Sequence, residues 1–150
     1  MCGIVGYIGS REAVDFLLKG LRRLEYRGYD SSGVVTINEG GELAITKSAG
    51  RVDDLADKLQ KSPVKGQVGI GHTRWATHGP ATDINAHPHL GGDVGLAIVH
   101  NGVIENFHTL KERLEQKGYV FKSSTDSEVI AHLISSEMED VDWEVSDPAE

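Results

Sequence analysis

The only cysteine of the chain, Cys2, stands between Met1 and Gly3 and directly ahead of a glycine-punctuated apolar stretch. A single cysteine excludes an internal disulfide, so the chain must fold around an apolar core and keep one free thiol. Residues 3–8 place apolar pairs between glycines, which predicts a short buried strand whose first residue is Cys2. The thiol is therefore tied to the first strand of the fold.

The position of Cys2 also favours a particular chemistry. A small residue after Met1 allows an aminopeptidase to remove the methionine, which leaves Cys2 with both a thiol and a free α-amine. An α-amine has a pKa of about 7.7–8, so it can accept the proton of its own thiol, directly or through a water. Two alternatives stay open at this point: Cys2 is a small apolar filler of the strand, or a histidine elsewhere activates the thiol, as in a papain-like pair.

Length and composition indicate an ordinary water-soluble domain. The chain has 150 residues, of which 39% are hydrophobic, enough for one apolar core. Its longest apolar runs, such as residues 94–99, are far shorter than the roughly 20 residues that a membrane-spanning helix needs. No basic segment precedes an apolar run at the N-terminus, so we expect a cytoplasmic protein without a membrane partner.

The net charge of −8 is concentrated at the C-terminal end. From Ser123 onward there are nine acids and no Lys or Arg, whereas residues 1–122 carry 14 acids and 15 bases. A nearly neutral body gives no reason to expect a nucleic-acid partner. We expect the acidic segment, about residues 139–150, to be a solvated tail or a piece of a longer protein.

Helices and short strands alternate along the chain. Helices are predicted from Ser10 as N-cap to residue 25, from residue 53 or 54 to 61, from Asn106 as cap to residue 117, and over residues 126–138. The last of these would begin with a capping box formed by Thr125 and Glu128.

Strands are predicted over residues 34–38 and 43–47 as a hairpin, and over residues 67–72, 94–99 and 119–122. Residues 73–92 show no periodicity, and a loop of that length inside a compact domain usually carries function. The order of elements predicts an α+β fold with helices outside its sheets.

Several polar residues fall at strand ends or in the loops beside them, namely Cys2, Arg74, His78, Asn101 and Asp126. An arginine fork suits a carboxylate and an aspartate suits an ammonium, so Arg74 and Asp126 together would hold an α-amino acid by both charged ends. The alternatives are that Arg74 is a surface charge and that Asp126 only complements a helix dipole.

The Asn101-Gly102 pair offers a side-chain amide and a flexible backbone amide after an apolar strand. Two such donors can form an oxyanion hole, although Asn-Gly is also a common turn.

The seven histidines raise the question of a metal site. His87-Pro88-His89 has a ligand-like spacing, but no Glu or Cys completes a known zinc pattern. We therefore expect no metal and no cofactor, with most histidines hydrogen-bonded in loops or in the core. A non-catalytic, histidine-rich metal-binding module remains an alternative.

Six stretches, in this order along the chain, resemble the N-terminal glutaminase domain of the glucosamine-6-phosphate synthase family, a class II (N-terminal-nucleophile) glutamine amidotransferase. They are MCGIVGYIG (1–9), LEYRGYDSSG (24–33), GHTRWATHG (71–79), NAHPH (85–89), HNG (100–102) and STDSEVIAHL (124–133). Amidophosphoribosyltransferases and asparagine synthetases share the N-terminal Cys-Gly. The RGYDSSG and RWATHG stretches, however, resemble the sugar-phosphate branch, which leaves an amidophosphoribosyltransferase-type glutaminase as the alternative.

The resemblance implies a four-layer αββα fold with two antiparallel sheets between helical layers, of which residues 1–150 would be an incomplete type 2 amidotransferase domain. It implies that Cys2 attacks the side-chain amide of glutamine and forms a thioester, releasing ammonia and then glutamate. By position, Asn101 and Gly102 would form the oxyanion hole, Arg74 would bind the carboxylate of glutamine, and Asp126 would bind its amine.

Further along the same resemblance, Trp75, Thr77 and His78 would lie in a mobile loop that closes over glutamine. Members of the family continue into sugar-isomerase domains, which bind fructose 6-phosphate as the ammonia acceptor. The resemblance implies that the full-length protein forms a homo-oligomer through those domains, none of which is present in this chain.

Overall fold

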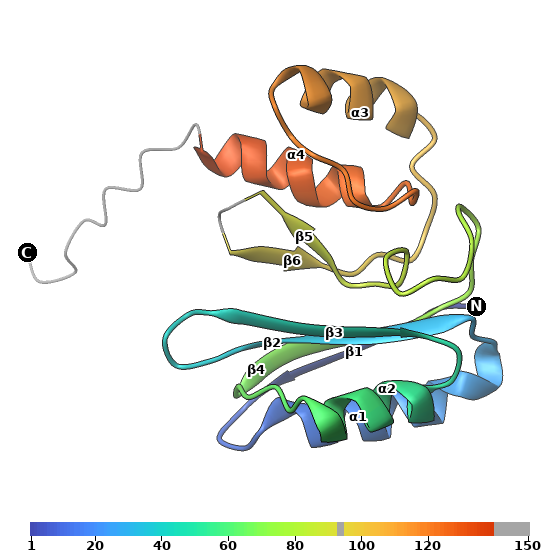
Figure 1. The fold of residues 1–150 in the computed structure, drawn as a ribbon, viewed down its shortest axis with the longest axis vertical. Helices are drawn as coiled ribbons and strands as arrows, with labels where there is room; N and C mark the ends of the chain where they lie inside the picture. Colours follow the sequence, from blue (N-terminus) through green and yellow to red (C-terminus); the bar gives the residue numbers. More distant parts are fainter. Residues whose placement is uncertain (93–94, 140–150) are drawn as a thin grey trace, which may run out of the picture.

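The computed structural model describes residues 1–92 and 95–139, which form four layers (Figure 1). Helices α1 and α2 form the first layer, a four-stranded sheet the second, a two-stranded sheet the third, and α3 with α4 the fourth. The predicted α+β arrangement of two antiparallel sheets between helices is confirmed. The elements are β1 (Gly3–Ile8), α1 (Ala13–Leu24), the 3₁₀ helix η1 (Glu25–Arg27), β2 (Ser31–Ile37), β3 (Leu43–Ala49), α2 (Val52–Lys61), β4 (Val68–Arg74), β5 (His89–Gly91), β6 (Leu96–Ile98), α3 (Phe107–Gln116) and α4 (Glu128–Glu139).

The larger sheet has the order β1-β4-β2-β3 and is antiparallel throughout. Gly3 pairs with Thr73 across β1 and β4, so the residue before β1 lies beside the residues that follow β4. Helix α1 approaches this end closely, because a Cβ on Gly3 would lie 2.6 Å from a methyl group of Leu24. The sheet register therefore brings Cys2 next to Arg74 and Trp75.

The apolar core lies between this sheet and the two helices α1 and α2. Fully buried side chains recur at helical spacing on both helices, which is the pattern of an amphipathic helix on a sheet. The core residues are Ala13, Leu17, Leu21, Val34, Val52, Leu55 and Leu59.

The predicted strand at residues 3–8 is present, but it is not buried as expected. Ile4 is 46% exposed and Ile8 is 81% exposed. Because β1 is an edge strand, only the face that carries Val5 and Tyr7 packs against the core.

Two predicted helix starts are wrong, and in both the acidic side chain at the start of the helix binds backbone N–H groups elsewhere in the chain. Helix α1 begins at Ala13 rather than Ser10, and the Glu12 carboxylate accepts the backbone N–H of Gly66 at 2.8 Å. Helix α4 begins at Glu128, whose carboxylate accepts the backbone N–H groups of Lys122 and Ser123 at 2.8 and 2.7 Å instead of closing a capping box.

Two further predictions are wrong, one of a strand and one of a loop. Residues 119–122 form no strand, since the Lys122 N–H is bound by Glu128. The stretch 73–92 is not all loop, because β5 forms within it and pairs with β6 through His89 and Ile98.

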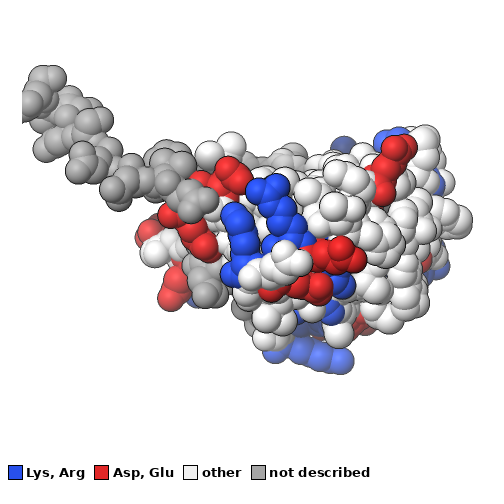
Figure 2. Space-filling model, turned by 90° about the horizontal axis from the view of Figure 1, so that it is seen from above, with Lys and Arg blue, Asp and Glu red and all other residues white. Residues whose placement is uncertain are grey.

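The surface over α3 and α4 carries acidic and basic side chains side by side (Figure 2). Within residues 1–92 and 95–139, no helix is long and apolar enough to cross a membrane. The acidic segment expected at about residues 139–150 lies, apart from Glu139, outside the described residues.

Candidate active site

A cavity of about 310 Å³ opens at the N-terminal end of β1. All eight residues expected at the site, from their pattern or from the family resemblance, line it, although they come from four separate parts of the chain. They are Cys2, Arg74, Trp75, Thr77, His78, Asn101, Gly102 and Asp126.

The thiol of Cys2 is held against the start of the loop after β4. Its Sγ accepts a hydrogen bond from the backbone N–H of Trp75 at 3.1 Å, and the residue is partly buried. The terminal amine belongs to Met1, which is 73% exposed, and it donates to the Arg27 carbonyl at 2.6 Å. With Met1 present, the α-amine is therefore not on the residue that carries the thiol.

The side-chain amide of Asn101 faces the thiol residue. Its Nδ2 donates to the Cys2 carbonyl at 3.4 Å, while its Oδ1 lies 2.8 Å from Nε2 of His72. The next residue must be glycine, because it has φ of +156° and an added Cβ would lie 2.8 Å from the ring of His100. The side-chain amide of Asn101 and the backbone of Gly102, which carries no side chain, thus line the same cavity as Cys2.

Arg74 is buried, with 4% exposure, so the alternative of a surface charge is wrong. Its guanidinium donates to the carbonyls of Pro80 and Gly79, both at 3.2 Å, and to that of His78. One nitrogen also lies 3.7 Å from the Asp30 carboxylate. Arg74 therefore already holds the loop at residues 78–80, and a ligand carboxylate would share its five N–H groups with these acceptors.

Asp126 lies in the same cavity, with 3% exposure, two residues before α4. One carboxylate oxygen accepts the backbone N–H of Ile104 at 2.7 Å. The other lies 3.9 Å from Nδ1 of His78. The second oxygen is the one with capacity for a ligand ammonium.

Two side chains of the loop after β4 pack against the rest of the fold. Trp75 is 55% exposed and covers Gly28, where an added Cβ would lie 2.6 Å from the indole ring. His78 contacts Thr77 at 3.3 Å and sets its ring edge-on to Phe107. This loop is thus supported on one side by residues near 28 and on the other by α3.

Sequence reasoning missed Asp30. Its backbone N–H donates to the Arg74 carbonyl at 2.7 Å, and its carboxylate accepts the N–H of Ala76. Asp30 thus fixes the turn between Arg74 and the loop. The only signal was its place in the polar stretch 26–33, which had no assigned role.

His72, His87 and His89 form a buried row beside Asn101, which sequence reasoning also missed. The rings of His72 and His87 stack at 4.3 Å, and those of His87 and His89 meet at 4.5 Å. Burial lowers the pKa of His72 to about 4 and that of His89 to about 3, and it lowers the pKa of His87 as well. All three are neutral at pH 7. Among the described residues no cluster of three or more His, Cys, Asp or Glu side chains could hold a metal ion.

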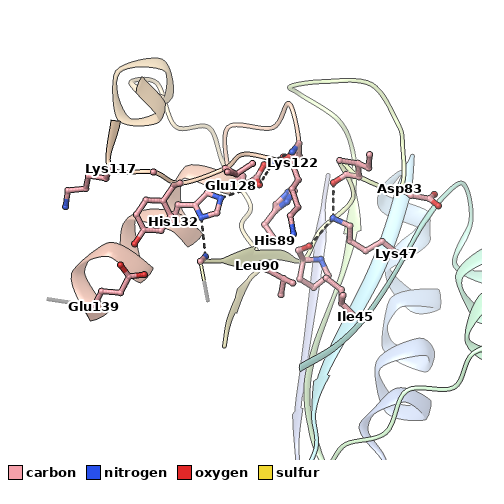
Figure 3. Close-up of a pocket in the computed structure, with 17 residues that line it drawn as sticks. Ile45, Lys47, Asp83, His89, Leu90, Lys117, Lys122, Glu128, His132 and Glu139 are labelled. Atoms are coloured by element: carbon pink, nitrogen blue, oxygen red, sulfur yellow. Dashed lines mark hydrogen bonds and ion pairs between the residues drawn. The ribbon is translucent and has the colours of Figure 1, made fainter. Parts of the chain in front are cut away.

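A larger cavity, of about 670 Å³, lies at the His89 end of this histidine row (Figure 3). His89 and Lys47 line it, and the Lys47 ammonium donates to the carbonyls of Ile84 and Pro88 at 2.9 and 3.3 Å. Burial lowers the pKa of Lys47 to about 8. None of the eight predicted residues lines this cavity.

Comparison with known proteins identifies the class. A model of the glutamine amidotransferase domain family matches residues 51–141. The match covers more than half of the chain, and the chain belongs to this family.

The curated relatives give a finer comparison. A glutamine–fructose-6-phosphate aminotransferase (isomerizing) of Thermococcus kodakarensis is 59% identical over 138 residues, which is 92% of this chain and 23% of the relative. The protein of the same name from Bacteroides thetaiotaomicron is 56% identical over 134 residues, or 89% of this chain and 22% of the relative. The chain spans less than a quarter of the length of these relatives.

A solved structure of similar fold comes from a second kind of amidotransferase. The glutamine phosphoribosylpyrophosphate amidotransferase of B. subtilis, solved with ADP and GMP, has a TM-score of 0.73 and 35% identity, covering 90% of this chain and 29% of its own. A structure described as the allosteric regulatory enzyme of purine biosynthesis has a TM-score of 0.76 and 36% identity, covering 90% of this chain and 29% of its own.

Proposed function

We propose that this domain hydrolyses glutamine to glutamate and ammonia through a thioester at Cys2. The observation that carries the proposal is that one cavity holds a thiol, an amide donor, a buried arginine and a buried aspartate, in a chain of the glutamine amidotransferase domain family. These groups match the reactive amide and the two charged ends of an α-amino acid.

In the proposed reaction, removal of Met1 gives Cys2 a free α-amine, which takes the proton of the thiol. The thiolate then attacks the side-chain carbonyl carbon of glutamine and forms a C–S bond. Asn101 Nδ2 and the Gly102 N–H stabilise the resulting oxyanion. The C–N bond breaks as the nitrogen receives a proton and leaves as ammonia, and water then hydrolyses the thioester to glutamate and the thiol.

The α-carboxylate and the α-ammonium of glutamine are attached to the same carbon, so they would bind together, with the side-chain amide reaching the thiol. Arg74 would bind the carboxylate and the free oxygen of Asp126 would bind the ammonium. Trp75, Thr77 and His78, in the loop held by Arg74 and Asp30, would cover the bound substrate.

The test is glutamate release by the chain after mass spectrometry has shown whether Met1 is present. Cys2→Ala should abolish hydrolysis, and a diazoketone analogue of glutamine should label Cys2 only in the form that lacks Met1. Full activity in a sample that retains Met1 would exclude the α-amine as base and favour a histidine.

The substrate contacts have a separate test. Asp126→Asn should raise the KM for glutamine, and Arg74→Lys should not restore what Arg74→Ala loses, because an ammonium cannot make a two-pronged contact. If KM stays unchanged in both Asp126→Asn and Arg74→Ala, neither residue binds glutamine.

For a protein of the relatives' length, we propose that the ammonia serves the synthesis of glucosamine 6-phosphate from fructose 6-phosphate. The named relatives at 56–59% identity support this acceptor. Such a protein would be cytoplasmic and would form a homo-oligomer through its further domains, with the present chain as an incomplete type 2 amidotransferase domain.

The similar solved structures favour a second acceptor, phosphoribosyl pyrophosphate, at 35–36% identity. If fructose 6-phosphate, and not phosphoribosyl pyrophosphate, stimulates glutamine hydrolysis in the longer protein, the acceptor is fructose 6-phosphate. The reverse result would identify phosphoribosyl pyrophosphate as the acceptor.

A further inference from the structure

We infer that His72 is a positioning residue, which holds the Asn101 amide with its N–H₂ group turned toward Cys2 by donating a hydrogen bond from Nε2 to Asn101 Oδ1. This inference rests on the proposed role of Asn101 in the oxyanion hole. His72 itself does not line the cavity, so its action is through Asn101.

The orientation of the Asn101 amide follows from its two neighbours. On one side stands the Cys2 carbonyl, 3.4 Å from Nδ2, and a carbonyl can only accept. On the other side stands His72 Nε2, 2.8 Å from Oδ1. With the amide reversed, Oδ1 would face the Cys2 carbonyl, and two acceptors would oppose each other.

This orientation requires one tautomer of His72. A neutral imidazole has one donor and one acceptor nitrogen, and Oδ1 needs a donor, so the proton must be on Nε2. Nδ1 is then an acceptor, and it is buried without a hydrogen-bond partner among the described residues. With the proton on Nδ1, the lone pair of Nε2 would repel Oδ1 and favour the reversed amide, which points an acceptor at the oxyanion.

The surroundings of His72 hold the ring in this place. His72 is fully buried in the central strand β4, and its ring stacks on that of His87 at 4.3 Å and 19°. His87 Nδ1 in turn accepts the backbone N–H of His100 at 3.4 Å, directly before Asn101. One histidine therefore holds the side chain of Asn101 and its neighbour holds the adjoining backbone.

Three substitutions of His72 separate the roles of its two ring nitrogens. Gln has its side-chain nitrogen at about the distance of Nε2, Asn at about that of Nδ1, and Leu has neither. We expect His72→Leu and His72→Asn to lower kcat by at least about tenfold, and His72→Gln to stay within about threefold of the wild type. KM should change little in all three, because Arg74 and Asp126 are untouched.

His89→Leu is the matched control. His89 is also buried in the same row, but it forms a hydrogen bond with Thr125 Oγ1 at 3.0 Å and none to Asn101 among the described residues. Its kcat should stay near that of the wild type. Thermal unfolding of each variant separates loss of fold from loss of turnover.

A double-mutant cycle with Asn101→Ala tests the coupling. Asn101→Ala alone should lower kcat by about 10²–10³-fold, and adding His72→Leu should lower it no further. If Asn101→Ala lowers kcat but His72→Leu does not, or if their effects multiply, the positioning role is wrong and the proposed function stands. If Asn101→Ala leaves kcat unchanged, the oxyanion role fails, and the inference fails with it.

A measurement that does not depend on turnover examines the tautomer itself. ¹⁵N NMR of the imidazole rings should report an Nε2–H tautomer for His72 in the wild type. The tautomer should shift toward Nδ1–H in Asn101→Ala, where the acceptor is missing. An Nδ1–H tautomer in the wild type would overturn the inference whatever the activity.

Discussion

The layer of α1 and α2 packs on the four-stranded sheet through aliphatic side chains, whereas α4 and the segment before it pack through polar ones. Leu17, Leu21 and Leu55 are fully buried in the first region. In the second, buried groups include Thr125, Glu128, His132 and Ser135 together with the histidine row. The first region is stabilised mainly by area removed from water, and the second depends more on hydrogen bonds between buried polar groups.

The active-site cavity lies between these two regions. Cys2 and Arg74 belong to the sheet of the aliphatic region, while Asn101 and Asp126 belong to the polar one. The difference teaches that Cys2 and Arg74 are positioned by a sheet packed on aliphatic side chains, whereas Asn101 and Asp126 are positioned by a hydrogen-bonded region. The two regions should therefore respond differently to pH and to substitution.

Acid should have the largest effect, and it should act through the polar region. The folded pKa values of His72 and His89 are about 4 and 3, below the ordinary value of 6.5, and that of His87 is also lowered. The unfolded chain then binds more protons, so stability is full above pH about 6.5 and falls as the pH drops toward the folded values. Three such groups give a slope of up to about 4 kcal/mol per pH unit, to be measured by urea unfolding between pH 7.5 and 4.5.

His89→Gln is the control for this acid effect. It should reduce the number of protons taken up on unfolding by about one. A stability that does not change between pH 7.5 and 5.5 would show that the histidines are not neutral in the folded protein.

Leu21→Ala should have the next largest effect, in the aliphatic region. Truncating a fully buried leucine leaves a cavity and should lower the free energy of unfolding by about 2–5 kcal/mol. The loss should be the same at pH 7.5 and 6, because the change removes only aliphatic atoms from the apolar core. Phe16→Ala, at a position that is 51% exposed, should cost much less. A strong pH dependence of the Leu21→Ala loss would erase the distinction between the regions.

Glu128→Gln should have a smaller effect, of about 1–3 kcal/mol at pH 7, by weakening a buried hydrogen-bonded carboxylate. Burial alone would raise the pKa of Glu128, but the His132 ring nitrogen 3.5 Å away and hydrogen bonds from Ser123 and from the N–H of Lys122 lower it to about 2. Its stabilisation is thus present above pH 4.5 and is lost as the pH falls toward 2. The loss in Glu128→Gln should shrink over that window in urea unfolding, and Glu112→Gln, at an exposed position, should show no loss.

Arg22→Ala should have the smallest effect. Arg22 pairs with Asp53 at 3.0 Å, but the two side chains are 47% and 74% exposed. Water and salt screen such a pair, so the free energy of unfolding should change by less than about 1 kcal/mol. A loss as large as that of Leu21→Ala would mean that surface charge, rather than aliphatic burial, stabilises this region.

Most elements of the aliphatic region could be predicted, because local patterns and the final contacts agree there. Residues 3–8 form the predicted strand, and the helix predicted to end at residue 61 does so. The residues chosen from strand ends and loops also line one cavity, together with Trp75 and Thr77, which the family resemblance added. Their roles in catalysis stay predictions.

The polar region was predicted less well, because partners distant in the sequence outcompete local rules. Glu128 and Thr125 match a capping box, but Glu128 binds the backbone before the helix and Thr125 binds His89, 36 residues away.

By itself, the amino-acid sequence determined that a lone thiol lies beside the first strand, that apolar faces recur at helical spacing, and that the chain resembles one family. These are properties of neighbouring residues. Only the tertiary structure decided that Asp30 holds the loop after Arg74 across 46 positions, and that His72 supports Asn101 across 29. A buried donor must find an acceptor wherever the fold provides one, and no local pattern says which distant residue that is.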